Sequence, residues 1–498
     1  MEEEYSAADP AQLLQAASDF DYYPGMQNEA SIKEFVRRFP LPVIINALQT
    51  KADVPGLENA LVACLERIFK SKYGASLIPQ YMPFLQVGLR ADSEAVRSLA
   101  CKAVSSLFEN LDDKSVSPAQ LIIACDVYPL LLDCLVNGNE QVAAASMDAI
   151  KNFASSPEGI ATIFPADSND ASDLRNLMAQ CSSLGRVRVL ALIVKLFSVS
   201  PSVASVIYNS KLLALLESEV SGANDTLVTL SVLELLYEMT EVKHAVEFLS
   251  KTSLLQLIST LISNTSMEPI LRSRAMIICG RMLSKENIFM FIDENSVRTV
   301  ISAIEGRLVS SETGDADECE SALEALGQIG SSMQGATLLL LSTPDAARFL
   351  IGAAFGRQSL GKQRLGKQMT ALLALGNIAG ENRSENAILN GDAEENLRRL
   401  IYEVASQSSK LTLSGLFLSI LQQESEIRLA GYRVISGLVA RPWCLMEICS
   451  KQEIINILTD SHTESTKIGM EARYNCCQTI LKALVVSASL RPILLSLE

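Results

Sequence analysis

The stretch RVRVLALIVKLFSVSPSVASVI, which begins at Arg186, decides the fold of this chain. Apolar residues first recur with the 3.6-residue period of a helix, Ser and Pro then break that helix, and a second short apolar helix follows. Similar stretches are QVAAASMDAIKNFASSPEGIATIF from Gln141 and ECESALEALGQIGSSMQGATLLL from Glu318. Alternation with a period of two residues is scarce, so the sequence predicts helices and no sheet.

The copies recur along almost the whole chain, at intervals of about 40 to 50 residues, which is the period of armadillo and HEAT repeats. Their apolar anchors are Phe153, Phe197, Met239, Leu283, Ile329 and Ile378. Another amphipathic segment, such as SLLQLISTLI from Ser253, lies between copies and makes three helices per unit. The interval from Ile378 to Leu438 is longer and contains LTLSGLFLSILQQ, which suggests an inserted helix.

A single helix pair cannot bury its apolar face alone, so each unit must pack on its neighbours. We therefore predict an all-α, armadillo/HEAT-type, right-handed superhelical solenoid over residues 29–498. Residues 1–28 are acidic and contain Pro and Gly, and we expect a flexible leader there. Residues 310–317 and 352–367 are expected to be long loops between helices.

Composition limits the possible partners. The formal net charge is -15 at pH 7, so the average field repels nucleic acid and anionic membrane, and we expect neither as a partner. Eleven Cys without a CxxC pair indicate reduced thiols, which is typical of a cytoplasmic and possible also for a nuclear protein. No secretory signal is visible at the start of the sequence, and Asp and Pro break the apolar runs below membrane-spanning length.

Catalytic patterns are weak. The two histidines, His244 and His462, lie several repeats apart, whereas a catalytic group needs its members within hydrogen-bond reach. Gly361, Gly366 and Lys367 match the spacing of a phosphate-binding loop, but Gln368 stands where Ser or Thr should bind magnesium. The sequence therefore predicts no enzyme, no cofactor and no metal site.

Several charged groups are possible contacts. A basic island in the acidic chain is either a solvated loop or a contact for an acidic peptide, and its members are Arg357, Lys362, Arg364 and Lys367. Acidic residues that precede or begin predicted helices are expected to cap them: Asp315, Asp317, Glu318, Glu320, Asp392, Glu394 and Glu395. We expect Trp443, the single Trp, to pack between helices rather than to contact a partner.

The order of these repeats resembles the proteasome non-ATPase regulatory subunit 5 chaperones. The similar segments are RVRVLALIVKLFSVSPSVASVIYNS from Arg186, ALEALGQIGSSMQGATLLL from Ala322 and EIRLAGYRVISGLVARPWCLMEIC from Glu426. Each segment could occur in another armadillo protein, so their collinear order from about residue 30 onward carries the resemblance. No short contact motif of the family can be placed on individual residues here.

The resemblance implies a chaperone that assembles the base of the proteasome regulatory particle and is absent from the mature 26S proteasome. It implies binding to the C-terminal domain of the AAA+ ATPase regulatory subunit 7, with regulatory subunit 4 and non-ATPase subunit 2 as neighbours. We expect the free chain to be a monomer. A general armadillo scaffold, for example in ubiquitin ligation or phosphatase regulation, is the alternative. A nuclear-import receptor is disfavoured because one Trp cannot form a groove ladder of Trp and Asn.

Overall fold

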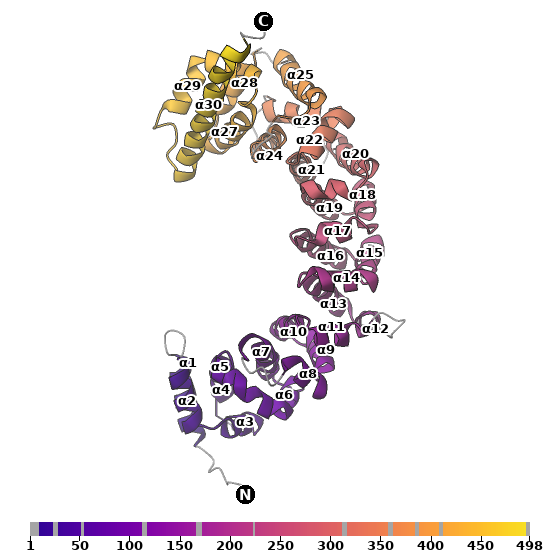
Figure 1. Cartoon of the computed structure of the whole chain (residues 1–498), viewed down its shortest axis with the longest axis vertical. Helices are drawn as coiled ribbons and strands as arrows, with labels where there is room; N and C mark the ends of the chain where they lie inside the picture. The colour runs from indigo at the N-terminus through magenta and orange to yellow at the C-terminus, as the bar shows by residue number, and fades with distance from the viewer. Residues whose placement is uncertain are drawn as a thin grey trace. The chain divides into compact units, whose positions relative to one another are not determined.

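The structure is a computed structural model. It describes residues 9–22, 28–50, 54–111, 117–165, 172–222, 225–310, 316–356, 362–383, 388–407 and 412–494. Over these ranges every regular element is a helix (Figure 1). The all-α armadillo/HEAT-type fold expected from the sequence is confirmed.

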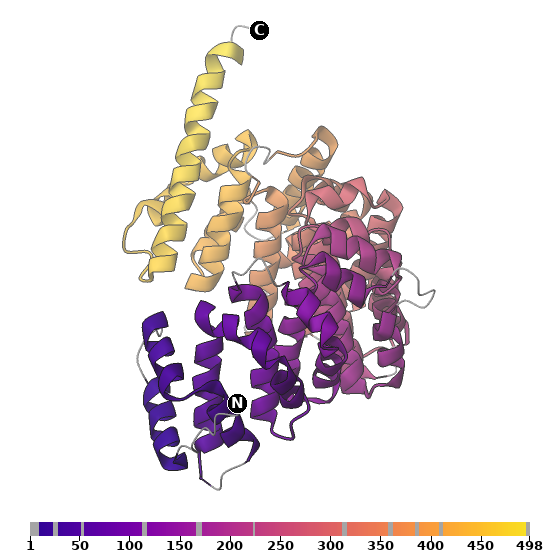
Figure 2. The same cartoon turned by 60° about the horizontal axis from the view of Figure 1, so that its bottom comes forward.

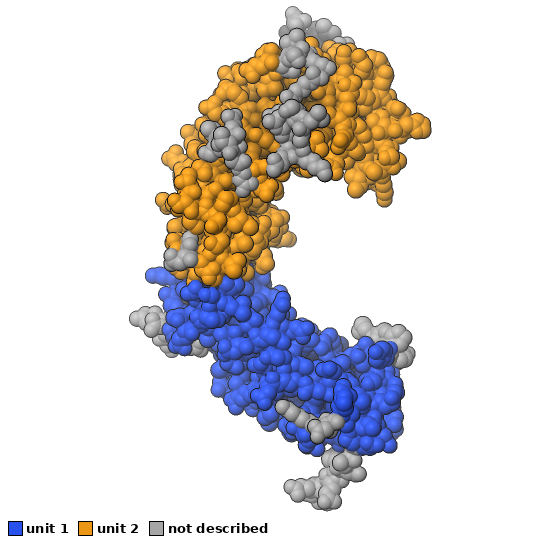
Figure 3. Space-filling view, turned by 180° about the vertical axis from the view of Figure 1, so that it is seen from behind, with its two compact units in different colours: residues 1–216 blue, residues 217–498 orange. Residues whose placement is uncertain are grey.

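The chain divides into two compact units, Met1–Leu216 and Glu217–Glu498 (Figure 3). Unit 1 contains α1 (Pro10–Asp21), α2 (Glu29–Arg38), α3 (Leu41–Gln49), α4 (Leu57–Phe69), α5 (Lys72–Leu77), η1 (Ile78–Tyr81), α6 (Met82–Leu89), α7 (Glu94–Asn110), α8 (Pro118–Ala124), α9 (Val127–Asn137), α10 (Glu140–Phe153), α11 (Pro157–Ile163), α12 (Ser172–Gln180), α13 (Ser183–Phe197) and α14 (Pro201–Asn209). The boundary falls within α15 (Leu213–Gly222). A single solenoid over residues 29–498 stays a prediction.

Unit 2 contains the remaining helices. They are α16 (Thr226–Thr240), α17 (Ala245–Leu249), α18 (Leu254–Ser263), α19 (Pro269–Leu283), η2 (Glu286–Met290), α20 (Glu294–Ser310), α21 (Ala316–Ile329), α22 (Met333–Ser342), α23 (Pro344–Phe355), α24 (Lys362–Ala379), α25 (Gly391–Gln407), α26 (Leu413–Leu421), α27 (Ser425–Leu438), α28 (Pro442–Ser450), α29 (Gln452–Thr459) and α30 (Lys467–Leu494).

One helix of each repeat packs against its counterpart in the next repeat, and we call these the ladder helices. In unit 1 they are α1, α4, α7, α10 and α13, and in unit 2 they are α16, α19, α21, α24, α27 and α30 (Figure 1). Two further helical elements, or three between α4 and α7, separate most successive ladder helices in the chain. This arrangement confirms the three-helix repeat.

The expected insertion before Leu438 is wrong. The segment LTLSGLFLSILQQ forms α26, which packs on α27 and is the second of two elements between the ladder helices α24 and α27. The interval from Ile378 to Leu438 is long because it contains α25, which has 17 residues, and a connecting segment at each end of that helix. The sequence motif is therefore an ordinary member of the repeat.

The six predicted anchors lie in the last turn or two of six ladder helices, α10 through α24. Each side chain is at most 1% exposed: Phe153, Phe197, Met239, Leu283, Ile329 and Ile378. Burying such a side chain stabilises the fold by about 1.5–3 kcal/mol. The anchors therefore hold each ladder helix onto the helices around it.

A Ser-x-x-Gly motif turns the chain sharply after three of the ladder helices. The Ser156 hydroxyl donates to the carbonyl of Phe153 at 2.9 Å and accepts from the Gly159 N–H at 3.0 Å. Equivalent bonds are made by Ser71 with Gly74 and by Ser332 with Gly335. A Cβ at Gly159 would lie 1.9 Å from the Phe153 carbonyl oxygen, so this close approach requires glycine.

The expected flexible leader over residues 1–28 is wrong for Pro10–Asp21, which forms α1. Leu13 and Ala17 are almost completely buried, and the Phe20 ring lies 4.5 Å from that of Phe35. Asp21 also accepts a 2.6 Å bond from the Arg67 Nε of α4. The apolar residues of α1 lie on one face that packs on α4, so α1 is a ladder helix rather than a tail.

The expected loop over residues 352–367 is also wrong at both ends. Helix α23 continues to Phe355 and α24 begins at Lys362, so the connection between them is short. The expected loop over 310–317 likewise includes the last residue of α20 and the first residues of α21, while 311–315 lie outside the described residues. In both places, part of the polar and glycine-containing sequence therefore belongs to helices.

Candidate partner-binding surface

The ladder helices of unit 2 that precede α30 leave narrow stripes of side chains uncovered, and together we call these stripes the ladder face. On α21 the stripe has the helical spacing i, i+4, i+7 and i+11, and it consists of Asp317, Ser321, Glu324 and Gln328. Neighbouring Ala322 and Leu326 are fully buried. Because the stripes of successive ladder helices lie side by side, they form a continuous surface that a folded partner can contact at many points.

A set of mutually packed side chains on this surface lies on α16 and α19. The Tyr237 ring of α16 lies between two guanidinium groups of α19, 4.0 Å from that of Arg274 and 4.1 Å from that of Arg281. Glu234 forms an ion pair with Arg274, and Glu241 pairs with Arg281 at 2.7 Å. We call these five residues the Tyr237 cluster. Tyr and Arg are enriched among the residues that dominate protein interfaces, and here their rotamers are restrained before any partner binds.

In unit 1 a groove lies between the ladder helices α4, α7 and α10. The groove has a volume of about 740 Å³ and is lined mainly by polar side chains. Glu66 accepts from Lys70 at 2.7 Å and from Lys102 at 2.8 Å, and Asp148 pairs with Lys195 at 2.7 Å. Burial alone would raise the pKa of Glu66, but the bonds from the two lysines lower it below its ordinary value. The carboxylate is therefore charged at neutral pH.

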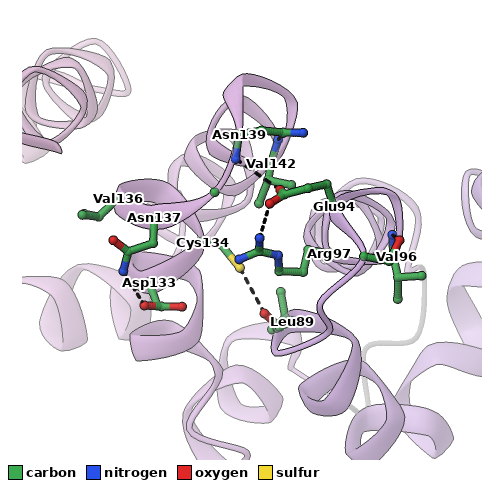
Figure 4. A network of polar contacts seen from close by, with 12 residues as sticks. Leu89, Glu94, Val96, Arg97, Asp133, Cys134, Val136, Asn137, Asn139 and Val142 are labelled. Atoms are coloured by element: carbon green, nitrogen blue, oxygen red, sulfur yellow. Dashed lines mark hydrogen bonds and ion pairs between the residues drawn. The ribbon is translucent and has the colours of Figure 1, made fainter. Parts of the chain in front are cut away.

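Polar contacts also join neighbouring repeats away from the ladder face (Figure 4). Glu94 at the start of α7 pairs with Arg97 and accepts from the Asn139 N–H at 3.2 Å (Figure 4). The Cys134 thiol of α9 donates to the carbonyl of Leu89 at 3.3 Å. These contacts bring together α6, α7, α9 and α10, so this network fixes the register between two repeats.

Arginines early in several ladder helices serve a structural role. Arg188 of α13 donates to the Gly138 carbonyl at 2.7 Å, and Arg428 of α27 donates to that of Gln423 at 2.8 Å. Arg473 of α30 donates to the Leu458 carbonyl at 2.6 Å. The carbonyls at a helix end lack partners within the helix, and a cation stabilises them. The guanidinium groups of these arginines therefore already have hydrogen-bond partners within the fold.

The acidic residues that were expected to cap helices do more than that. Glu318 in the first turn of α21 pairs with the buried Arg272 of α19 at 2.7 Å. Glu394 accepts from the Leu389 N–H at 3.3 Å, and it also pairs with the fully buried Arg441 at 2.6 Å. The capping expectation is incomplete because these carboxylates also reach buried arginines 46 or 47 positions away in the chain.

The same acidic groups include residues at ordinary capping positions. Asp317 lies in the first turn of α21 and Asp392 in the first turn of α25, and carboxylates there complement the helix dipole, as expected. Glu320 and Glu395 are the fifth residues of these helices and lie beyond the first turn. Asp315 lies outside the described residues.

The basic island is only partly described. Arg357 lies outside the described residues, and for Lys362 and Arg364 the structure describes the backbone of α24 but not the side chains. The Lys367 Nζ lies over the ring of Phe349 at 4.5 Å. This stacking restrains Lys367 against α23, and a role of the four residues in partner binding stays a prediction.

Other candidates from the sequence have structural surroundings. His244 precedes α17, with its ring edge-on to Phe248, and His462 follows α29. The Trp443 ring of α28 lies 5.9 Å from that of Tyr402 of α25, which confirms that it packs between helices. All eleven cysteines are free, and burial raises the pKa of Cys279 to about 12.

The described ranges contain neither a cluster of metal-ligating residues nor a single membrane-spanning helix. There, no group of three or more His, Cys, Asp or Glu is placed to hold a metal ion. No single helix in that part of the chain is both long and apolar enough to cross a membrane. Two pairs, α8 with α9 and α22 with α23, reach that length and hydropathy only jointly, with bends of 83° and 101°.

Sequence reasoning missed an apolar hollow in unit 1. It has a volume of about 560 Å³ and lies between α3, α4, α6 and α7. Its walls include Leu48, Phe69, Tyr81, Phe84 and Val96. Phe84 is 42% exposed, so an aromatic side chain of the wall is open to solvent. The spacing of Tyr81 and Phe84 could have indicated an aromatic patch, but not the helices that face it.

This chain is similar to known proteins over most of its length. The family model described as "Proteasome non-ATPase 26S subunit" matches residues 57–492. The 26S proteasome non-ATPase regulatory subunit 5 of Bos taurus is 21% identical over 434 residues, which cover 87% of this chain and 81% of that protein. The Homo sapiens protein of the same name is 20% identical over the same shares of the two chains.

Two solved structures resemble this chain with low sequence identity and low TM-scores. A crystal structure of importin beta is 14% identical, with a TM-score of 0.44, and the match covers 95% of this chain and 62% of that one. A designed armadillo repeat protein in complex with the peptide (KR)4 is 20% identical, with a TM-score of 0.31, and the match covers 45% of this chain and 90% of that one.

Proposed function

Because this chain belongs to the family of proteasome non-ATPase 26S subunits, we propose that it is an assembly chaperone for the base of the proteasome regulatory particle. On this proposal it binds the C-terminal domain of the AAA+ ATPase regulatory subunit 7 and leaves before the 26S proteasome is complete. The observation that carries the proposal is the family match over residues 57–492, which includes nearly every ladder helix.

The ladder face supplies the mechanism on this proposal. A stripe on each ladder helix makes a few contacts, and several stripes together can hold a folded domain without any chemical step. The Tyr237 cluster provides a restrained aromatic anchor within unit 2. Occupying a surface of the ATPase subunit excludes a competing partner by overlap, and release follows when later subunits bind that surface more favourably.

The basic island remains a second proposed contact. Arg357, Lys362, Arg364 and Lys367 lie near the start of α24, which is a ladder helix. Their positive charges would attract an acidic segment of a partner, although the whole chain has a net charge of -15. Changing all four residues to Glu should then weaken partner binding and reduce its dependence on salt.

The test is a binding assay of the full chain against the isolated C-terminal domains of all six ATPase subunits. We expect regulatory subunit 7 to bind, the other five to bind at least about tenfold more weakly, and the chain to be missing from purified 26S proteasome. Equal binding to all six domains, or to none, would overturn the proposal. Recovery of the chain from cells with a ubiquitin ligase or a phosphatase instead would favour the general scaffold.

A further inference from the structure

The last ladder helix, α30, has an apolar face that nothing in the described structure covers. Its inner face packs on the preceding repeat through Cys476 and Ile480, which are 0% and 7% exposed. A second face of the helix carries a stripe of four large apolar side chains that are between 44% and 62% exposed: Met470, Tyr474, Leu481 and Val485. Figure 2 shows the C-terminal part of α30 extending beyond the helices that pack on it.

Contiguous exposed apolar patches on soluble proteins commonly mark interaction sites. On α21 the uncovered positions are instead polar or acidic, as Asp317 and Glu324 show. The apolar side chains on α30 therefore need a partner surface.

The spacing of the stripe on α30 is symmetric. Met470 and Val485 lie equally far from the point between Cys477 and Gln478, and so do Tyr474 and Leu481. When two such helices pair antiparallel about that point, Met470 lies opposite Val485 of the second copy, and Tyr474 lies opposite Leu481. The paired stretch is about 22 Å long at 1.5 Å per residue. Self-complementarity of this kind is what a twofold interface requires.

The charges beside the stripe fit the same pairing. Glu471 and Lys482 are exposed and lie on the same side of the stripe, near its two ends. Antiparallel pairing brings Glu471 of one copy close to Lys482 of the other, and the twofold axis repeats this ion pair. Within one helix, Glu471 makes a loose contact with Lys467 at 3.8 Å. Complementary charges that flank an apolar seam fix the orientation and register of paired helices.

From these observations we propose that the free chain forms a homodimer through the antiparallel pairing of two α30 helices. The occupant of the apolar face is a second copy of this chain. This inference departs from the monomer expected from the sequence, and it does not depend on the proposed proteasome function.

Sedimentation equilibrium of the full chain between about 0.5 and 50 µM tests the proposal, because weak specific contacts dissociate in this range. We expect a reversible equilibrium between monomer and dimer. Leu481→Glu should raise the dissociation constant at least about tenfold, because it places two charges in the apolar seam. Met446→Glu, at a 66% exposed position of α28, is the control and should leave the constant unchanged.

A charge exchange tests the register at positions that tolerate substitution. Lys482→Glu should weaken the dimer, and the double variant Glu471→Lys with Lys482→Glu should restore it. Circular dichroism checks that each variant keeps the helical fold. A chain that stays monomeric over the whole range would overturn the proposal, as would a dimer that Leu481→Glu leaves intact or a charge exchange that fails to restore association. Binding of the regulatory subunit 7 domain to α30 of a chain that never dimerises would also count against it.

Discussion

Arg272 on α19 and Glu318 on α21 form a two-point ion pair in the interior of unit 2. The Arg272 Nε lies 2.7 Å from Oε1 of Glu318, and its Nη2 lies 2.9 Å from Oε2. Both residues are under 9% exposed. The pair joins two adjacent ladder helices through residues 46 positions apart in the sequence. A contact of this type sets the register of one repeat on the next.

Removing one partner of this pair should destabilise unit 2 strongly. Glu318→Leu leaves the Arg272 guanidinium buried without its counter-charge, which costs about 3–5 kcal/mol. The double variant Arg272→Met with Glu318→Leu should recover most of that loss, because no charge then remains buried. Urea unfolding followed by circular dichroism, arranged as a double-mutant cycle, measures both effects. Equal losses in the single and double variants would contradict the assigned role.

The turn after α10 predicts a steric effect of a single methyl group. In Gly159→Ala the new Cβ would clash with the Phe153 carbonyl oxygen, so the turn must open and the helix cap at Ser156 is strained. We expect a loss of about 1–3 kcal/mol. Gly352→Ala is the matched control, since its Cβ would meet nothing within 4 Å and the helix α23 should gain up to about 1 kcal/mol. Thermal unfolding of both variants distinguishes the two directions.

Helix α1 should contribute to stability rather than behave as a tail. Leu13 is 1% exposed, and Leu13→Ala should cost about 2–5 kcal/mol if α1 is packed as described. Tyr22→Ala, at a position that is 87% exposed, should be neutral. Hydrogen exchange of α1 and α4 in both variants reports the local effect. Unchanged protection of these helices in Leu13→Ala would show that α1 does not depend on this contact.

Glu464 should make stability depend on pH. Its carboxylate accepts from Tyr432 at 3.0 Å and from Ser425 at 3.2 Å, and it pairs with Arg428. Burial alone would raise the pKa of Glu464, but these hydrogen bonds lower it below its ordinary value of 4.5. A lowered folded-state pKa means that the stabilisation is present above about pH 4.5 and is lost as the pH falls through the folded-state value.

Comparing the wild type with the variant Glu464→Gln isolates the contribution of the Glu464 charge to stability. The free energy of unfolding of the wild type should exceed that of the variant by a constant amount between about pH 5 and 7. The difference should shrink below about pH 4.5, where the unfolded chain begins to bind a proton at residue 464, and it should vanish as the pH falls through the lowered folded-state pKa. Urea unfolding at several pH values gives the two curves. A difference that grows as the pH falls would have the wrong sign for a lowered pKa.

The Tyr237 cluster makes a prediction about partner binding. If the ladder face of unit 2 contacts the regulatory subunit 7 domain, Tyr237→Ala should weaken binding at least about tenfold, as expected for a central aromatic anchor. Met290→Ala, at a position that is 75% exposed and outside the ladder helices, should have no effect. Isothermal titration of both variants provides the comparison. Full affinity in Tyr237→Ala would place the contact elsewhere on the chain.

Sequence alone determined the helical repeat, its three-helix composition and its buried anchors, such as Phe153 and Ile329. These features follow from the 3.6-residue period and from local breaks at Ser, Pro and Gly, which involve residues close together in the chain. Tertiary structure decided which residues meet between repeats, including Tyr237 with Arg274 and α1 with α4. Those contacts join positions tens of residues apart, and they depend on how neighbouring helices are set in register, which no local pattern specifies.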